Sequence, residues 1–232
     1  MALSGTWTYW TNTEALDTII EAYERIGMDG SQLSGNQIDS ANRSLMALFS
    51  EFANKPVNLW TVSSLQTQAL TAGLQSFNLQ IYDLFILQAA TRTTSGGVNE
   101  DLIISPISRA EYMALPNKAQ QSTRPTQYYL QRSITPTVYV WPTADSANVS
   151  IIYYAARMQQ DVGAFTNTLD APQRWADAII AGLAARLAIK FAPDRYDKLQ
   201  LLADRAYAAA ATEDTENVPL RLVPDMQGRR IP

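Results

Sequence analysis

The sequence predicts an α+β protein: a four-helix bundle made of N- and C-terminal helix pairs, an inserted antiparallel β subdomain and an extended C-terminal arm. Apolar residues recur at helical spacing near both ends of the chain. The centre is rich in Thr, Ser, Val, Ile and Tyr, with Pro and Gly as punctuation. The last stretch carries prolines that disfavour helix. We expect the bundle from residues 13–55 and 170–212, the β subdomain from 56–169, and the arm from 213–232.

Two amphipathic helices are predicted first. Thr13 is the expected cap of the first helix, and Gly27 follows its last apolar residue. Ser34 and Gln37 have capping-box spacing at the start of the second helix, which ends before Pro56. Each helix carries one apolar stripe, and burying both stripes requires partner helices.

Short strands are predicted in the central region. One hairpin is expected from strands 86–93 and 98–104, which flank Ser95-Gly96-Gly97. A second is expected from strands 137–141 and 149–154, joined by a turn at 144–148. A short helix is expected at 109–115.

Two alanine-rich helices are predicted near the C-terminus. Asp170-Ala-Pro172 is a start signal for a helix that runs to Phe191, and Pro193 starts another that runs to about Thr212. Small side chains at this density let the two helices pack closely as an antiparallel hairpin.

The composition excludes several functional classes. The 232 residues contain no Cys and no His, which removes disulfides, thiolate nucleophiles, imidazole catalysis and most zinc sites. The net charge of −4 is a poor basis for gripping DNA. No run of 18 apolar residues and no signal peptide is present, so we expect no membrane partner and a soluble protein made in a reducing cytoplasm.

Carboxylates are the remaining candidates for catalysis. Two positioned acids could hydrolyse a glycoside, but no motif surrounds the acids of this chain, and solvated or helix-start charges are the favoured interpretation. We therefore expect no enzyme activity, no cofactor and no metal site. The acids considered are Asp83, Glu100, Asp101, Glu111, Asp194, Asp197 and Asp204.

Arginines and aromatic residues are the other candidate binding residues of this chain. Arginine outnumbers lysine, and forked guanidiniums favour interfaces, so Arg221, Arg229 and Arg230 are predicted interface residues. Aromatic residues of the central region could line a ligand groove, but a core face is the favoured interpretation. They are Trp60, Tyr128, Tyr129, Trp141, Tyr153 and Tyr154.

An ordered series of segments resembles the head-to-tail adaptor family of short-tailed phages, also called tail tubular protein A or packaged-DNA stabilisation proteins. The resemblance spans about residues 13–223, and the series persuades more than any single motif. Its segments are Asp17–Gly27, Ala41–Asn54, Val57–Val62, Ile104–Tyr112, Pro116–Lys118, Arg124–Tyr129 and Val140–Pro142.

The resemblance implies a structural protein of the virion that is made in the host cytoplasm. Such adaptors form a ring of identical subunits, usually twelvefold, between the portal protein and the tail nozzle protein, and some also attach tail fibres. The ring continues the DNA channel, contacts the genome passively and helps retain it. The bundle and the arm engage the portal, which gives Val218, Leu220, Arg221, Leu222, Val223, Arg229 and Arg230 as expected portal-binding residues.

Features of the residues fit this expectation. An acidic lumen repels the DNA backbone and lets DNA slide, and an arm that orders on a neighbour suits sequential assembly. Two alternatives stay open. One is a distal tail-completion or fibre-docking protein, and the other is a tail-associated cell-wall hydrolase that uses Glu100 or Asp101. The role of Trp7, Tyr9 and Trp10 is open as well.

Overall fold

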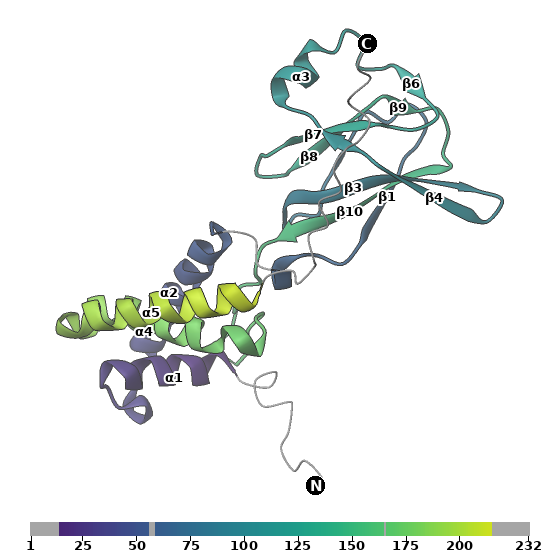
Figure 1. Ribbon diagram of the computed structural model, residues 1–232. Helices are drawn as coiled ribbons and strands as arrows, with labels where there is room; N and C mark the ends of the chain where they lie inside the picture. Colours follow the sequence, from purple (N-terminus) through teal and green to yellow (C-terminus); the bar gives the residue numbers. More distant parts are fainter. Residues whose placement is uncertain (1–13, 56–58, 165, 215–232) are drawn as a thin grey trace, which may run out of the picture.

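The computed structural model describes residues 14–55, 59–164 and 166–214. The longer helices gather at one end of the molecule and the strands at the other (Figure 1). Each end has its own hydrophobic core, one formed by the helices and one formed between sheets. The α+β class is thereby confirmed. The predicted domain limits remain a prediction.

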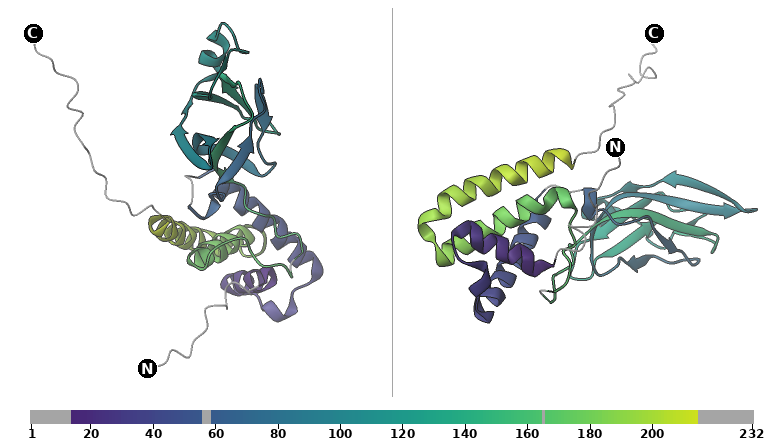
Figure 2. Two further views of the ribbon diagram at one scale, coloured as in Figure 1. Left: turned by 90° about the vertical axis from the view of Figure 1, so that its right-hand side faces the viewer. Right: turned by 90° about the horizontal axis from the view of Figure 1, so that it is seen from below.

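Four helices share the first core: α1 (Ala15–Ile26), α2 (Gly35–Ala53), α4 (Ala176–Phe191) and α5 (Tyr196–Glu213). Helix α4 packs against each of the other three. Its buried face is mostly small, so neighbours approach closely, and the side chain of Leu48 lies over Gly182. A regular four-helix bundle is not confirmed, because α2 lies across the direction of the other three helices (Figure 2).

Several predicted helix ends are confirmed. Ser34 and Gln37 form the capping box of α2, and Gly27 ends α1 with φ of 87°, a left-handed conformation that favours glycine. The predicted cap of α1 is wrong: Glu14 occupies the N-cap position without a side-chain bond, and Thr13 lies outside the described residues.

The predicted start signal of the third long helix needs correction. A short 3₁₀ turn, Gln173–Trp175, precedes α4, and the turn's N-cap, Pro172, makes no side-chain capping bond. Asp170 is instead held by Arg157, whose guanidinium donates two hydrogen bonds, of 2.5 and 2.9 Å, to the carboxylate. The acid therefore ties the end of the last strand to the start of the C-terminal helices.

An aromatic cluster joins helices that are far apart in sequence. Trp175 is fully buried, and the rings of Phe52, Trp60 and Tyr207 lie with their centroids 5.4 to 6.0 Å from its own. Trp60 belongs to the 3₁₀ turn Leu59–Thr61, just before the first strand, so the cluster fixes the chain where it enters the β region.

The strands form two four-stranded sheets that enclose the second core. The first has the order β1-β10-β3-β4 and is antiparallel throughout, and the second has the order β2-β8-β7-β5. A two-stranded sheet pairs β6 with β9. The bounds are β1 (Gln66–Ala69), β2 (Ser76–Asn78), β3 (Asp83–Ser95), β4 (Val98–Ile103), β5 (Ser105–Pro106), β6 (Gln121–Ser122), β7 (Gln127–Gln131), β8 (Thr137–Trp141), β9 (Thr143–Ala144) and β10 (Val149–Arg157).

One predicted hairpin is confirmed and the other is wrong. Strands β3 and β4 turn at Gly96 and Gly97, both at positive φ, as a tight hairpin turn requires. Strands β8 and β10 exist as predicted but belong to different sheets, because β9 intervenes and pairs with β6. The β region is also not wholly antiparallel, since β5–β7 and β6–β9 run parallel. The short helix α3 (Arg109–Ala114) is confirmed.

Candidate assembly surfaces

The predicted portal-binding residues lie outside the part of the chain that the structure describes. They are Val218, Leu220, Arg221, Leu222, Val223, Arg229 and Arg230. The structure does show how the segment before them is anchored. Asp214 at the end of α5 is buried, and Arg174 donates hydrogen bonds to its Oδ1. Because Arg174 precedes α4, the chain leaves the helical core from a fixed point.

The candidate acids other than Asp83 pair with arginine, cap a helix or lie exposed on the surface. Arg92 donates two hydrogen bonds of 2.7 Å to Asp101, and Arg124 lies 3.7 Å from Glu100. Glu111 completes the capping box of α3 with Ser108. Asp194, Asp197 and Asp204 lie on the exposed side of the 3₁₀ turn Pro193–Arg195 and of α5.

Asp83 is the exception, because its carboxylate is buried at the start of β3 and no hydrogen bond to either oxygen is found. Burial raises the pKa of Asp83, and burial together with the Asp83 charge raises the pKa of Tyr153 to about 12. A raised carboxyl pKa is useful to a general acid. However, the described residues contain no group of three or more acids that could hold a metal ion.

The predicted aromatic residues divide between core and surface. Tyr128 and Tyr153 are buried in the β core, as expected, whereas Trp60 lies in a 3₁₀ turn and packs on the helical core. Trp141 is half-buried and donates from Nε1 to the carbonyl of Asn117. Tyr154 is 41% exposed, so it belongs to a surface rather than to a core face.

Tyr129 belongs to an aromatic stack that was not predicted from the sequence. It stacks against Tyr112 of α3 and Tyr139 of β8, with ring centroids 5.3 and 5.8 Å away. Tyr129 and Tyr139 lie directly opposite each other on β7 and β8. Their side chains therefore share one face of the sheet, which the alternation of residues along the two strands could have indicated. The stack holds α3 against the second sheet.

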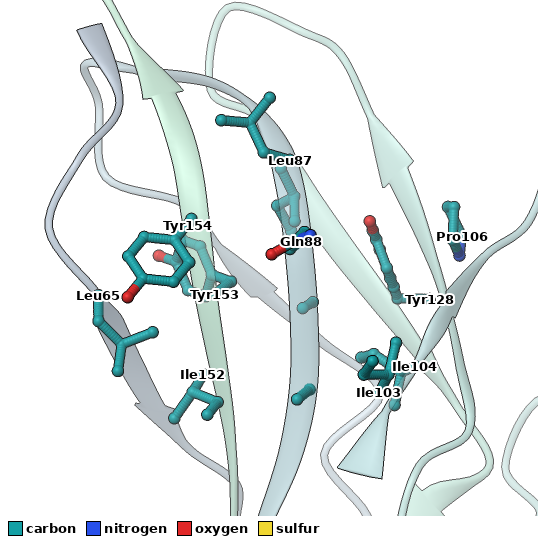
Figure 3. Close-up of a pocket in the computed structure, with 13 residues that line it drawn as sticks. Leu65, Leu87, Gln88, Ile103, Ile104, Pro106, Tyr128, Ile152, Tyr153 and Tyr154 are labelled. Carbon is teal, nitrogen blue, oxygen red and sulfur yellow. The ribbon is translucent and has the colours of Figure 1, made fainter. Parts of the chain in front are cut away.

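An apolar groove of about 390 Å³ opens beside β3. Figure 3 shows its residues coming from several strands: Leu65 just before β1, Ile152 and Tyr154 on β10, and Ile103 at the end of β4. Polar groups are few, since Gln88 is the only lining residue with a polar side chain other than tyrosine. Such a surface suits contact with protein rather than with a charged small molecule.

The outer strand β4 is exposed along its whole length and carries exposed apolar side chains near both of its ends. All six of its residues are exposed, and the exposed fraction is 70% for Val98 and 84% for Ile103. In the described part of the chain no strand pairs with its outer edge. Unpaired edges template pairing with another chain, so β4 is a candidate contact surface. The residue pattern at 98–104 predicts this strand but not its exposure.

The described residues form two unlike halves, each with its own core, and present an exposed strand edge and an apolar groove as candidate surfaces for contact with other proteins. None of the helices in the described residues is long and apolar enough to cross a membrane.

Comparison with known proteins places the chain in a family. The model of the SU10 adaptor protein family matches residues 14–223, nearly the whole chain. The chain belongs to the SU10 adaptor protein family. An adaptor family is thus confirmed, whereas the finer resemblance to tail tubular protein A stays a prediction.

Similarity to individual known proteins is weak. No curated protein matches. A solved structure described as the neck of an empty GTA particle, computed with C6 symmetry, matches with 14% sequence identity and a TM-score of 0.30. The match covers 83% of this chain and 85% of that chain.

Proposed function

We propose that this protein is a virion head–tail adaptor that forms a ring between the portal and the tail nozzle. The observation that carries the proposal is the family match over residues 14–223, which includes the helical part, the β part and the first half of the predicted arm. In this assembly the ring continues the DNA channel and helps retain the packaged genome.

The physical properties of the chain support a passive conduit. With a net charge of −4 the subunit repels the phosphate backbone, so DNA slides past instead of binding. The helical part and the arm, including Arg221, Arg229 and Arg230, would contact the portal, and the β part would face the distal tail. Forked guanidiniums form bidentate bonds to carboxylates, which suits these arginines to an interface.

The first test is assembly with the portal protein encoded in the same genome. The two purified proteins are mixed and imaged by electron microscopy. We expect an added ring below the portal that matches the portal's symmetry. A bare portal in the presence of excess protein would contradict the proposal.

A pull-down separates the adaptor from the fibre-docking alternative. The portal, nozzle and fibre proteins serve in turn as baits for the full chain. An adaptor binds the portal bait, whereas capture by the fibre protein alone would favour a distal tail-completion protein. A cell-wall turbidity assay with the full chain tests the hydrolase alternative, and we expect no clearing.

A further inference from the structure

Among the described residues, no strand pairs with either edge of the first sheet, and the strands at those two edges run in opposite directions. Its order is β1-β10-β3-β4, and each neighbouring pair is antiparallel. Three antiparallel steps separate β1 from β4, so the two strands are antiparallel to each other. If identical subunits repeat side by side, β4 of one subunit therefore meets β1 of the next in an antiparallel orientation.

The backbone groups on both edges are placed for such pairing. The amide of Leu70 donates to the carbonyl of Val149, and the amide of Ile104 donates to the carbonyl of Ala89. Bonding direction alternates along an antiparallel strand. It follows that Thr67 and Ala69 turn their backbone groups away from β10, and that Asn99, Asp101 and Ile103 turn theirs away from β3.

Side chains at matching positions of the two edge strands point to the same face of the sheet. The sheet register places Thr67, Ile152, Ala90 and Ile103 directly across from one another, so their side chains share one face. A contact that sets Asp101 opposite Thr67 and Asn99 opposite Ala69 of a neighbour keeps this face continuous. The same register brings Ile103, which is 84% exposed, beside Leu65 of the neighbour, which is 42% exposed.

Charge favours this pairing over a two-fold pairing of β4 with itself. Strand β4 carries Glu100 and Asp101, each beside an arginine of its own subunit, and a two-fold contact would bring these acids close to the same acids of the other copy. Strand β1 has the sequence Gln-Thr-Gln-Ala and carries no charge. A β4–β1 contact also joins two unlike surfaces, and a ring of identical subunits is built from such contacts. A two-fold contact uses the same surface on both copies and therefore produces a dimer.

We propose that the ring subunits are joined by a continuous β-sheet, in which β4 of each subunit pairs with β1 of the next copy. This inference rests on the proposed function, since it names the contact that closes the adaptor ring. Burial of Ile103 against the neighbour would also extend the apolar groove across the subunit boundary.

Disulfide crosslinking tests the contact, because the chain contains no cysteine of its own. The double variant A69C/N99C is assembled on the portal, oxidised and run on a denaturing gel without reductant. We expect a ladder of linked subunits. The single variants A69C and N99C should give no ladder, and a dimer band from N99C alone would overturn the proposal in favour of two-fold pairing. The pair N99C/I134C, with Ile134 fully exposed between β7 and β8, is the control for random collision.

A single proline substitution tests the contact independently through the strength of ring assembly. Ile103→Pro removes an amide that faces outward and leaves the β3 ladder intact, so the subunit should fold but bind its neighbours about tenfold more weakly. Met113→Lys, on exposed α3, is the matched surface control. Thermal unfolding of the free subunits checks that both variants fold. Ring formation by Ile103→Pro at the wild-type level would overturn the proposal.

Different outcomes contradict the adaptor function and the β4–β1 contact. Absence of any ring on the portal with the wild-type chain contradicts the adaptor function. A normal wild-type ring that yields no A69C/N99C ladder, or no more than N99C/I134C, contradicts only the β4–β1 contact.

Discussion

At the scale of a single residue, burial of the Asp83 carboxylate lowers the free energy of unfolding. Its side chain is 1% exposed and its carboxylate oxygens accept no hydrogen bond in the structure. Burial raises the pKa of this carboxyl, since the charged form loses its water without gaining a partner. The charge therefore opposes folding at neutral pH.

We expect Asp83→Asn to raise the free energy of unfolding at pH 7 by roughly 1 kcal/mol. The raised pKa means that the protonated carboxyl is the form favoured by folding. The wild-type penalty is thus absent below the ordinary aspartate pKa and appears as the pH rises through the raised value. Urea unfolding of both proteins at pH 7 and at about pH 4 checks this, and a gain of equal size at both would contradict it.

Asp170 has the opposite behaviour. Burial raises its pKa, but hydrogen bonds from Arg157 and from the amide of Gln160 outweigh that effect and hold the pKa below its usual value. A lowered pKa contributes stability above the unfolded-state value, and that stability is lost as the pH falls through the folded-state value.

We predict that Asp170→Asn lowers the free energy of unfolding at pH 7 by about 2 kcal/mol, because a half-buried, doubly hydrogen-bonded guanidinium loses its charged partner. Denaturant titrations from pH 7 down to about pH 3 should show a smaller acid loss in the variant than in the wild type. Asp161→Asn, on an exposed loop residue, is the control. Parallel pH profiles for the wild type and Asp170→Asn would refute the assignment.

At the scale of elements, small residues decide how closely the helices pack. A Cβ placed on Gly182 of α4 would lie 2.9 Å from a methyl carbon of Leu48, which is itself buried in α2. Because α2 lies across α4, this crossing point tolerates little added volume.

Gly182→Val should therefore lower the free energy of unfolding by about 1–3 kcal/mol, the usual range for overpacking. Ala208→Val on the exposed side of α5 adds the same kind of side chain without a clash and should change stability by less than about 0.5 kcal/mol. Thermal or urea unfolding compares the two. A Gly182→Val variant as stable as Ala208→Val would show that the helices can move apart at no cost.

At the scale of the whole molecule, we propose that folding and portal binding depend on different parts of the chain. The helical core ends at Asp214, which Arg174 holds in place, and the predicted portal-binding residues follow it.

Deleting residues 217–232 should abolish or greatly weaken portal binding and leave the melting temperature of the subunit within a few degrees of wild type. Co-sedimentation with the portal protein measures the first effect and thermal unfolding the second. The triple variant R221A/R229A/R230A tests whether the arginines carry the effect. Undiminished ring assembly by the truncated chain would refute the role of the arm.

The sequence by itself determined most of the elements, because local signals carry them. Capping at Ser34, the glycine after α1, the Gly96-Gly97 turn and the strands at 137–141 and from 149 onward are set by neighbours in the chain. The arm residues lie beyond the described residues and are still predictions.

Only the tertiary structure decided the pairing of strands and the crossing of helices. Strands β8 and β10 are close in sequence, but they part into two sheets because β9 pairs elsewhere and both strands then bury apolar faces in one core. Likewise, the local sequence around Asp170 predicts a helix cap. In the folded chain the end of β10 places Arg157 beside Asp170, and the carboxylate accepts hydrogen bonds from that guanidinium instead. The exposure of β4 depends on which strand lies at the edge of the sheet, and contacts between distant residues, not local propensity, fix that order.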